Sequence, residues 1–185
     1  MTEADELRRE KLEARRAMPR QQVEELSRRI AERLVQLPEY KEAGTVMIYK
    51  AVRGEVQLEL CGDKRFLYPR CTAPGEMLAL LPATDMEWEK GAFGIPEPVR
   101  ELSVEIEPKD IDLVICPCTA FDSACRRLGM GGGYYDRFLP KCSRAAFVAV
   151  AYEMQRADML PQQSWDVPMD AVVTETKLYR RDREE

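Results

Sequence analysis

The sequence contains no histidine. Imidazole is the usual general base of Ser-His-Asp and Cys-His catalytic systems and a common nitrogen ligand of metal ions. The absence of histidine therefore excludes both kinds of site. Any chemistry must depend on carboxylates, Lys, Arg, Tyr, hydroxyl groups, backbone amides or a metal held by oxygen ligands.

The chain also lacks long apolar runs, CxxC spacing and an excess of positive charge. No stretch approaches the roughly 20 apolar residues of a membrane span, and residues 1–36 mix both charge signs, unlike a secretory signal. Six cysteines without CxxC spacing are expected to be reduced thiols. A net charge of -5 argues against nucleic-acid binding. We expect a cytoplasmic monomer that binds neither nucleic acid nor membranes.

Length and composition indicate one domain over residues 1–185, with 45% hydrophobic and 33% charged residues. The N-terminal segment predicts two helices with a break at Met18-Pro19, because proline is tolerated in the first turn of a helix but not in its interior. The second helix is expected to end at Pro38. Its apolar residues recur at helical spacing, at Val23, Leu26, Ile30, Leu34 and Leu37.

After Gly44 the pattern changes to short apolar runs separated by turn residues, which predicts strands. Helix-length segments at 134–141 and 153–160 lie between some of these runs, and 83–108 is expected to be an ordered surface connection. This order favours an α/β fold, a three-layer sandwich with a largely parallel central sheet and an N-terminal helical segment. The predicted strands are 45–49, 65–69, 77–81, 113–116, 145–151 and 171–174.

The strongest chemical signal is a strand, a glycine-rich turn and a helix in residues 112–140. Glycines at 129 and 131–133 permit positive φ angles and let backbone amides converge on an anion. The spacing is neither the Walker motif nor the Rossmann fingerprint, and a glycine run alone is equally compatible with a tight turn. The adjoining Arg127 and Asp136 and the two neighbouring tyrosines favour a nucleotide site.

A family resemblance lies in residues 121–139, FDSACRRLGMGGGYYDRFL, which are similar to the signature of the 5-formyltetrahydrofolate cyclo-ligase family, especially its bacterial members. Further matches extend over most of the chain and include GEV at 54–56, GIPEP at 94–98 and WDVP at 165–168. The sequence departs from the family where it often has glycine, at Cys125 and near Cys118, and where it has histidine, at Trp165. Cys125 lies in the turn that precedes the glycine run, so this departure bears on the geometry of that turn.

The resemblance implies an ATP site, a folate site and a magnesium site. Arg127 and Asp136 are implied to be catalytic, and Asp136 and Asp166 match magnesium ligands. Residues implied to bind ATP are Lys11, Arg15, Arg127, Leu128, Gly129, Met130, Gly131, Gly132, Gly133, Tyr134 and Tyr135. Residues implied to bind the folate substrate are Glu55, Phe93, Met130, Gly131, Gly132, Gly133 and Tyr134.

Each of these roles has a purely structural alternative. Lys11 and Arg15 are four residues apart on one helix face, where such pairs are usually solvated charge. Asp136 could simply be favourable in the first turn of a helix. Phe93 and the tyrosines could be core aromatics, which is the commoner role of such residues.

The resemblance also implies a fold similar to the sugar-phosphate isomerase and CoA-transferase group. The family reaction converts 5-formyltetrahydrofolate and ATP, with Mg²⁺, into 5,10-methenyltetrahydrofolate, ADP and phosphate. Two alternatives stay open: a non-catalytic folate- or nucleotide-binding relative, and an enzyme of the isomerase or transferase kind. Arg127, Asp136 and Asp166 together favour the ligase over the non-catalytic relative.

Overall fold

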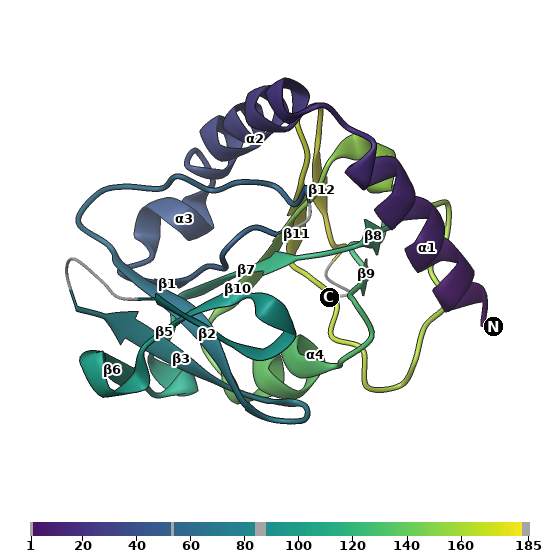
Figure 1. Cartoon of the computed structure of the whole chain (residues 1–185). Coiled ribbons are helices and arrows are strands. Elements are labelled where there is room, and N and C mark those ends of the chain that lie inside the picture. The colour runs from purple at the N-terminus through teal and green to yellow at the C-terminus, as the bar shows by residue number, and fades with distance from the viewer. Residues whose placement is uncertain (1, 53, 84–87, 183–185) are drawn as a thin grey trace.

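The computed structural model describes residues 2–52, 54–83 and 88–182, and the chain begins with helices (Figure 1). Helix α1 (Glu3–Arg16) starts with a capping box, in which the side chains of Thr2 and Asp5 accept each other's backbone N–H groups. Pro19 separates it from α2 (Arg20–Leu34). The predicted pair of helices with a break at Met18-Pro19 is confirmed. Two short helices follow later, α3 (Pro38–Glu42) and α4 (Tyr134–Phe138).

Within the described residues the main sheet has eight strands in the order β12-β11-β10-β7-β1-β2-β3-β6. Strands β11, β10, β7, β1 and β2 are parallel, whereas β12, β3 and β6 join antiparallel at the two sides. The largely parallel central sheet is therefore confirmed. The bounds are β1 (Thr45–Met47), β2 (Arg65–Ala73), β3 (Glu76–Pro82), β6 (Ser103–Ile106), β7 (Leu113–Pro117), β10 (Ala146–Val150), β11 (Ala171–Val173) and β12 (Leu178–Arg180).

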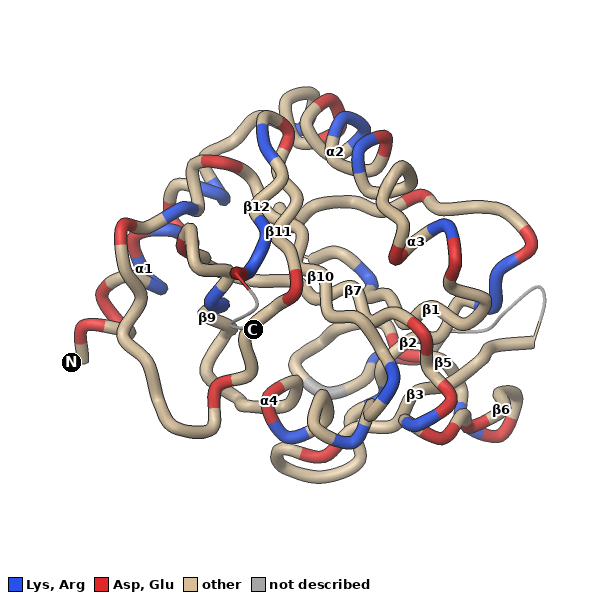
Figure 2. Tube along the Cα trace, turned by 180° about the vertical axis from the view of Figure 1, so that it is seen from behind, with Lys and Arg blue, Asp and Glu red and all other residues tan. Residues whose placement is uncertain are grey.

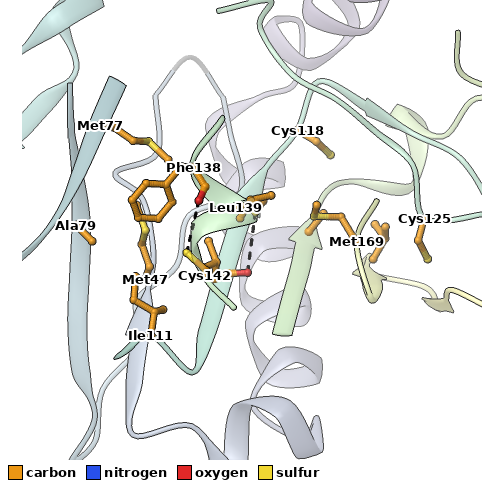
Figure 3. Packing of buried hydrophobic residues seen from close by; sticks show 14 of the residues in the cluster. Met47, Met77, Ala79, Ile111, Cys118, Cys125, Phe138, Leu139, Cys142 and Met169 are labelled. Carbon is orange, nitrogen blue, oxygen red and sulfur yellow. Dashed lines mark hydrogen bonds between the residues drawn. The ribbon is translucent and has the colours of Figure 1, made fainter. Parts of the chain in front are cut away.

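Both faces of the sheet are covered, because alternate residues of each strand point in opposite directions. On one face, Leu113 and Ile115 of β7 belong to a core cluster with residues of α2 and α3. On the other face, Val114 and Cys116 belong to a cluster with residues of α4 and the turn that follows it. Figure 3 shows this second cluster, with Phe138 beside Met77. Parallel strands covered on both sides are expected to be continuously apolar, as β7 is.

The predicted strands all lie in the main sheet, with ends that differ by a few residues. The sequence missed β6 and β12, which lie at the two edges of the sheet. Edge strands are exposed on one side and carry charged residues, so they lack the apolar signature. The likeness to sugar-phosphate isomerases and CoA transferases stays a prediction.

The predicted helix at 153–160 is wrong. Only Glu153–Gln155 forms a 3-10 turn, and residues 156–160 form no helix. The reason is tertiary, because the backbone N–H groups of this segment donate outside it. Ala157 donates to Phe121 at 2.8 Å and Leu160 donates to the Asp122 carboxylate at 3.1 Å.

Two boundaries were also predicted wrongly. The second helix ends at Leu34, and Pro38 begins α3 instead of ending a helix, a position that suits its missing N–H. The segment 83–108 is more than a connection. It contains β4 (Trp88–Lys90) and β5 (Pro96–Pro98), which form a hairpin, and also β6; residues 84–87 lie outside the described part of the chain.

Cys125 stands at a left-handed position, with a φ of 60°. That conformation costs a non-glycine residue about 1–2 kcal/mol, which explains why glycine suits this turn. The turn is held by the Cys125 N–H, which donates to Asp122 O at 3.0 Å, and by Met169, which donates to Cys125 O at 2.9 Å. The Cys125 side chain is fully buried, and this burial offsets part of the strain.

Acidic and basic residues are mixed along α1 and α2 (Figure 2). This mixture is typical of helices whose outer faces meet water. None of the helices in the described part of the chain is long and apolar enough to cross a membrane. The cytoplasmic location and the monomeric state stay predictions.

Candidate active site

A cavity of about 540 Å³ lies at the carboxyl ends of the parallel strands. Tyr49 and Lys50, which follow β1, and Cys118 and Thr119, which follow β7, line it. Open parallel sheets commonly bind ligands at this edge. Helix α1, the glycine loop and the segment 93–97 complete the boundary of the cavity.

The glycine loop, residues 129–133, connects strand β9 (Arg127–Leu128) to α4. Gly131 has a φ of 97° and Gly133 a φ of 65°, conformations that strongly favour glycine. The prediction that these glycines lie outside regular strands is confirmed. Among the described residues, the N–H groups of 131–133 donate to no protein acceptor. Helix α4 has only five residues, so its dipole is small. An anion at the loop would therefore be stabilised mainly by these amides.

Helix α1 lies against the glycine loop (Figure 1). Its Ala4 and Leu7 pack on Leu128 and on β8 (Ala120–Phe121). Arg8 donates from Nε to Gly129 O at 2.9 Å. The sequence prediction missed Arg8, although this residue lies two turns before Arg15 on the same helix face.

Arg15 lines the cavity, whereas Lys11 is not among the lining residues. The Arg15 side chain is 2% exposed, and its Nη1 donates to Cys118 O at 3.3 Å. Its Nη2 lies 3.7 Å from Glu55 Oε1, and neither Nε nor Nη2 has a hydrogen-bond acceptor in the described structure. Lys11 Nζ instead lies 3.2 Å from Glu10. The structure therefore brings only one residue of the predicted pair to the cavity.

Arg127 and Asp136 form an ion pair in the cavity wall. Arg127 Nη2 donates to Asp136 Oδ1 at 2.9 Å, and the guanidinium lies 5.4 Å from the ring centroid of Tyr135. The Arg127 Nε is buried without an acceptor among the described residues. Burial lowers the pKa of Arg127, but Cys116 and Asp136 more than compensate and hold it above its usual value. The guanidinium stays charged.

Asp136 and Asp166 line the same cavity. Asp166 Oδ2 accepts the N–H of Gln163 at 2.8 Å. No cluster of three or more His, Cys, Asp or Glu residues that could hold a metal occurs in the described ranges. Two carboxylates nevertheless fit Mg²⁺, which proteins usually bind through one or two carboxylates together with waters and substrate phosphates.

Phe93 is strained and exposed at the cavity edge. It lies in a 3-10 turn (Ala92–Gly94) with a φ of 61°, and its side chain is 64% exposed. Its ring meets Tyr134 edge to face, with centroids 5.8 Å apart. The residue is not a glycine, which would adopt this φ without strain, and its side chain gains no stability from burial. Backbone strain of this kind often occurs at ligand sites.

Three further charged residues line the cavity, namely Glu55, Glu97 and Lys50. Glu55 accepts the Val52 N–H at 3.0 Å. Sequence reasoning missed Glu97, whose side chain is buried, and Lys50, whose Nζ lies 4.4 Å from the ring centroid of Trp88. Glu97 lies within the GIPEP segment that carried part of the family resemblance, so the signal was present.

The thiols near the cavity are protonated at neutral pH. Burial raises the pKa of Cys116 and of Cys118 to about 12. Burial and the neighbouring Glu97 raise the pKa of Cys71 to about 11. All six cysteines of the chain lie in the described part and are free, as predicted. Protonated thiols are poor nucleophiles and poor metal ligands.

The cavity thus collects nearly all of the predicted site residues. Lys11 is the exception. Those that line the cavity are Arg15, Glu55, Phe93, Arg127, Leu128, Gly129, Met130, Gly131, Gly132, Gly133, Tyr134, Tyr135, Asp136 and Asp166.

Fold and cavity define a ligand-binding α/β protein with a glycine loop and buried guanidinium groups at the carboxyl edge of a parallel sheet. The family model of 5-formyltetrahydrofolate cyclo-ligase matches residues 1–175. The 5-formyltetrahydrofolate cyclo-ligase of Escherichia coli K12 is 31% identical over 177 residues, which cover 89% of this chain and 96% of that protein. The chain therefore belongs to the 5-formyltetrahydrofolate cyclo-ligase family of enzymes.

Solved structures agree with this assignment. The 5,10-methenyltetrahydrofolate synthetase of Aquifex aeolicus matches with a TM-score of 0.87 and 34% identity, over 100% of this chain and 96% of that chain. The synthetase of Mycoplasma pneumoniae has a TM-score of 0.76 over 94% of this chain and 99% of that chain. Its 24% identity supports the fold alone.

Proposed function

We propose that the protein converts 5-formyltetrahydrofolate and ATP into 5,10-methenyltetrahydrofolate, ADP and phosphate. One observation carries the proposal: Arg15 and Arg127, from distant parts of the chain, line one cavity with buried N–H groups that find no acceptor among the described residues. Such groups are costly when unpaired. Phosphate oxygens supply strong acceptors for guanidinium groups.

The chemistry must convert a poor leaving group into a good one. The formyl oxygen attacks the γ-phosphorus of ATP, the bond from that phosphorus to the bridging oxygen breaks, and ADP leaves. The folate nitrogen at position 10 then attacks the formyl carbon and loses its proton. The carbon–oxygen bond breaks and phosphate leaves, so the carbon becomes the methenyl bridge. These steps depend on positioning and charge neutralisation, which need no histidine.

The proposed phosphate side of the site comprises Arg15, Arg127 and the loop amides. Arg8 replaces Lys11 as the second cation of α1 in this proposal, because it contacts the loop directly. Asp136 and Asp166 would hold Mg²⁺, which would neutralise part of the charge on the transferring phosphoryl group. Arg127 and Asp136 are the proposed catalytic residues, since both lie where that charge would be held.

The proposed folate side comprises Phe93, Tyr134, Met130 and Glu55. A flat ligand ring that stacks on the exposed Phe93 ring would bury it, and this burial would offset the backbone strain. Met130 is 51% exposed and adaptable in shape. The folate ring would thus lie between this aromatic edge and the glycine loop.

The first experiment measures ADP release from ATP and Mg²⁺ with and without 5-formyltetrahydrofolate. Release that requires the folate is expected. Folate binding without ADP release would instead indicate a non-catalytic relative. An enzyme of the isomerase or transferase kind would show neither folate-dependent ADP release nor folate binding.

A further inference from the structure

The carboxylate of Glu97 in β5 has no role in the function proposed above. It is 4% exposed and lines the cavity. Its Oε1 accepts the N–H of Cys71 at a long 3.3 Å. Within residues 2–52, 54–83 and 88–182, no Lys or Arg forms an ion pair with it. The Cys71 thiol also lies against this carboxylate. A carboxyl group has several acceptor positions, so the contacts with Cys71 leave acceptor capacity for a ligand.

Gly91 leaves the space that Glu97 occupies. A Cβ atom at Gly91 would lie 2.1 Å from Cδ and 2.3 Å from Oε2 of Glu97. The φ of Gly91 lies outside the left-handed range, so its backbone does not demand glycine. What demands glycine here is the position of the carboxylate.

The hairpin of β4 and β5 places two acidic residues opposite each other. Glu89 of β4 stands opposite Glu97 of β5, and like charges across two strands destabilise them. Arg70 forms an ion pair with Glu89 and donates to Pro98 O at 2.7 Å, so it neutralises Glu89. No described Lys or Arg compensates Glu97 in this way. Glu55, the other carboxylate on this part of the cavity, does lie beside a cation, Arg15.

We propose that Glu97 determines substrate specificity by accepting two N–H groups from the edge of the reduced pterin ring, the 2-amino group and the ring N–H beside it. A carboxylate accepts two parallel N–H donors well. Phe93, four residues before Glu97, lines the same cavity and would stack on the ring whose edge Glu97 binds. This inference rests on the proposed function, because it takes folate as the substrate.

The test compares Glu97→Gln with a matched control, Glu89→Gln. Glutamine keeps the size but loses the charge and one acceptor, so the KM for 5-formyltetrahydrofolate should rise about 10- to 100-fold. The KM for ATP should change less than about two-fold, and kcat should fall less than KM rises. The control removes an exposed, compensated carboxylate from the same hairpin and should change neither constant. An unchanged KM for the folate in folded Glu97→Gln protein would overturn the proposal.

A binding experiment on the unmodified protein tests the same contact if Glu97→Gln does not fold. Calorimetric titration compares 5-formyltetrahydrofolate with its 2-desamino analogue, which lacks one of the two donors. The analogue should bind at least about 10-fold more weakly to the unmodified protein. Equal affinity of the unmodified protein for both ligands would overturn the proposal.

The two proposals fail separately. A protein that discriminates between these ligands but releases no ADP would keep the role of Glu97 and lose the catalytic function. A protein that releases ADP on adding folate but binds both ligands equally would keep the function and lose the role of Glu97.

Discussion

Two walls of the cavity differ in the charged groups that they present and in the elements that pack behind them. The loop wall, formed by Arg8, Arg15, Arg127 and residues 129–133, presents three cations, of which Arg15 and Arg127 are buried. Its amides at 131–133 donate to no acceptor among the described residues. The hairpin wall, formed by residues 93–97, presents an exposed aromatic ring and a buried carboxylate. The loop wall is supported by α1 and β9, whereas the hairpin wall carries strain at Phe93. In the function proposed above, the phosphates meet the loop wall, and the folate ring lies between Phe93 of the hairpin wall and the glycine loop.

The largest effect is expected for Asp136→Asn, which alters the loop wall. Loss of the charge should reduce turnover at least about 100-fold, because both metal binding and the pairing with Arg127 weaken. Asparagine can still accept the Arg127 hydrogen bond, so we expect a folded but less stable protein. ADP release across a magnesium titration, with urea unfolding as the companion measurement, tests this. Unchanged turnover at every magnesium concentration would remove Asp136 from the mechanism.

The next effect concerns the cations of α1. Arg15→Ala should raise the KM for ATP about 10- to 100-fold, from the loss of charge-assisted hydrogen bonds, with less change in the KM for folate. Arg16→Ala is the matched control, since Arg16 is adjacent and exposed. Lys11→Ala should have a smaller effect than Arg15→Ala, because Lys11 does not line the cavity. Equal effects of Lys11→Ala and Arg15→Ala would restore the symmetric pair that the sequence predicts.

Deletion of residues 1–17 should weaken ATP binding more than Arg15→Ala does. The deletion removes Arg8 and Arg15 and exposes Leu128 and Leu160, which α1 covers. Steady-state kinetics with ATP varied, on protein checked by circular dichroism, measure the effect. A folded truncated protein with normal ATP dependence would show that α1 lies outside the site.

A smaller effect is expected at the hairpin wall. Phe93→Gly should raise the KM for 5-formyltetrahydrofolate several-fold, about 0.5–1.5 kcal/mol for a lost ring contact, and leave the KM for ATP unchanged. It should also stabilise the protein by up to about 1 kcal/mol, since glycine relieves the left-handed strain. Cys125 has nearly the same φ as Phe93, but its side chain is buried. Cys125→Gly should therefore not stabilise the fold, because the loss of buried atoms offsets the relief of strain. Thermal unfolding of both variants decides whether the strain at Phe93 is uncompensated.

The smallest effect concerns thiol reactivity on the two walls. With a pKa of about 11, Cys71 of β2 has about 0.1% thiolate at pH 8, and Cys118 beside the loop wall has even less. Exposed Cys61 should therefore react first with iodoacetamide, as peptide mass spectrometry would show. In Glu97→Gln protein, Cys71 should react faster, because a charge that raises its pKa is gone. Equal rates in both proteins would mean that Glu97 does not influence the thiol.

The two walls were not equally visible in the sequence. The part of the loop wall at 127–136 follows from local chemistry, because the glycines, Arg127 and Asp136 stand within ten residues of one another. The hairpin wall was predicted as a surface connection, within which the family resemblance implied one folate-binding residue, Phe93. Glu97 stood there as one glutamate among many, and neither its burial nor the space left by Gly91 is a local property.

The sequence by itself determined the α/β class, the strands of the parallel core and the glycine loop at the end of a strand, because apolar periodicity and glycine conformation act over short distances. Only the tertiary structure decided which charged residues meet. In place of a predicted helix at 153–160, it formed hydrogen bonds to β8 and to Asp122. It also brought Arg8 and Arg15, but not Lys11, to the cavity. It also buried the Glu97 carboxylate in the cavity wall. Such contacts depend on how α1 and the hairpin dock on the sheet, and this docking depends on the packing of distant side chains.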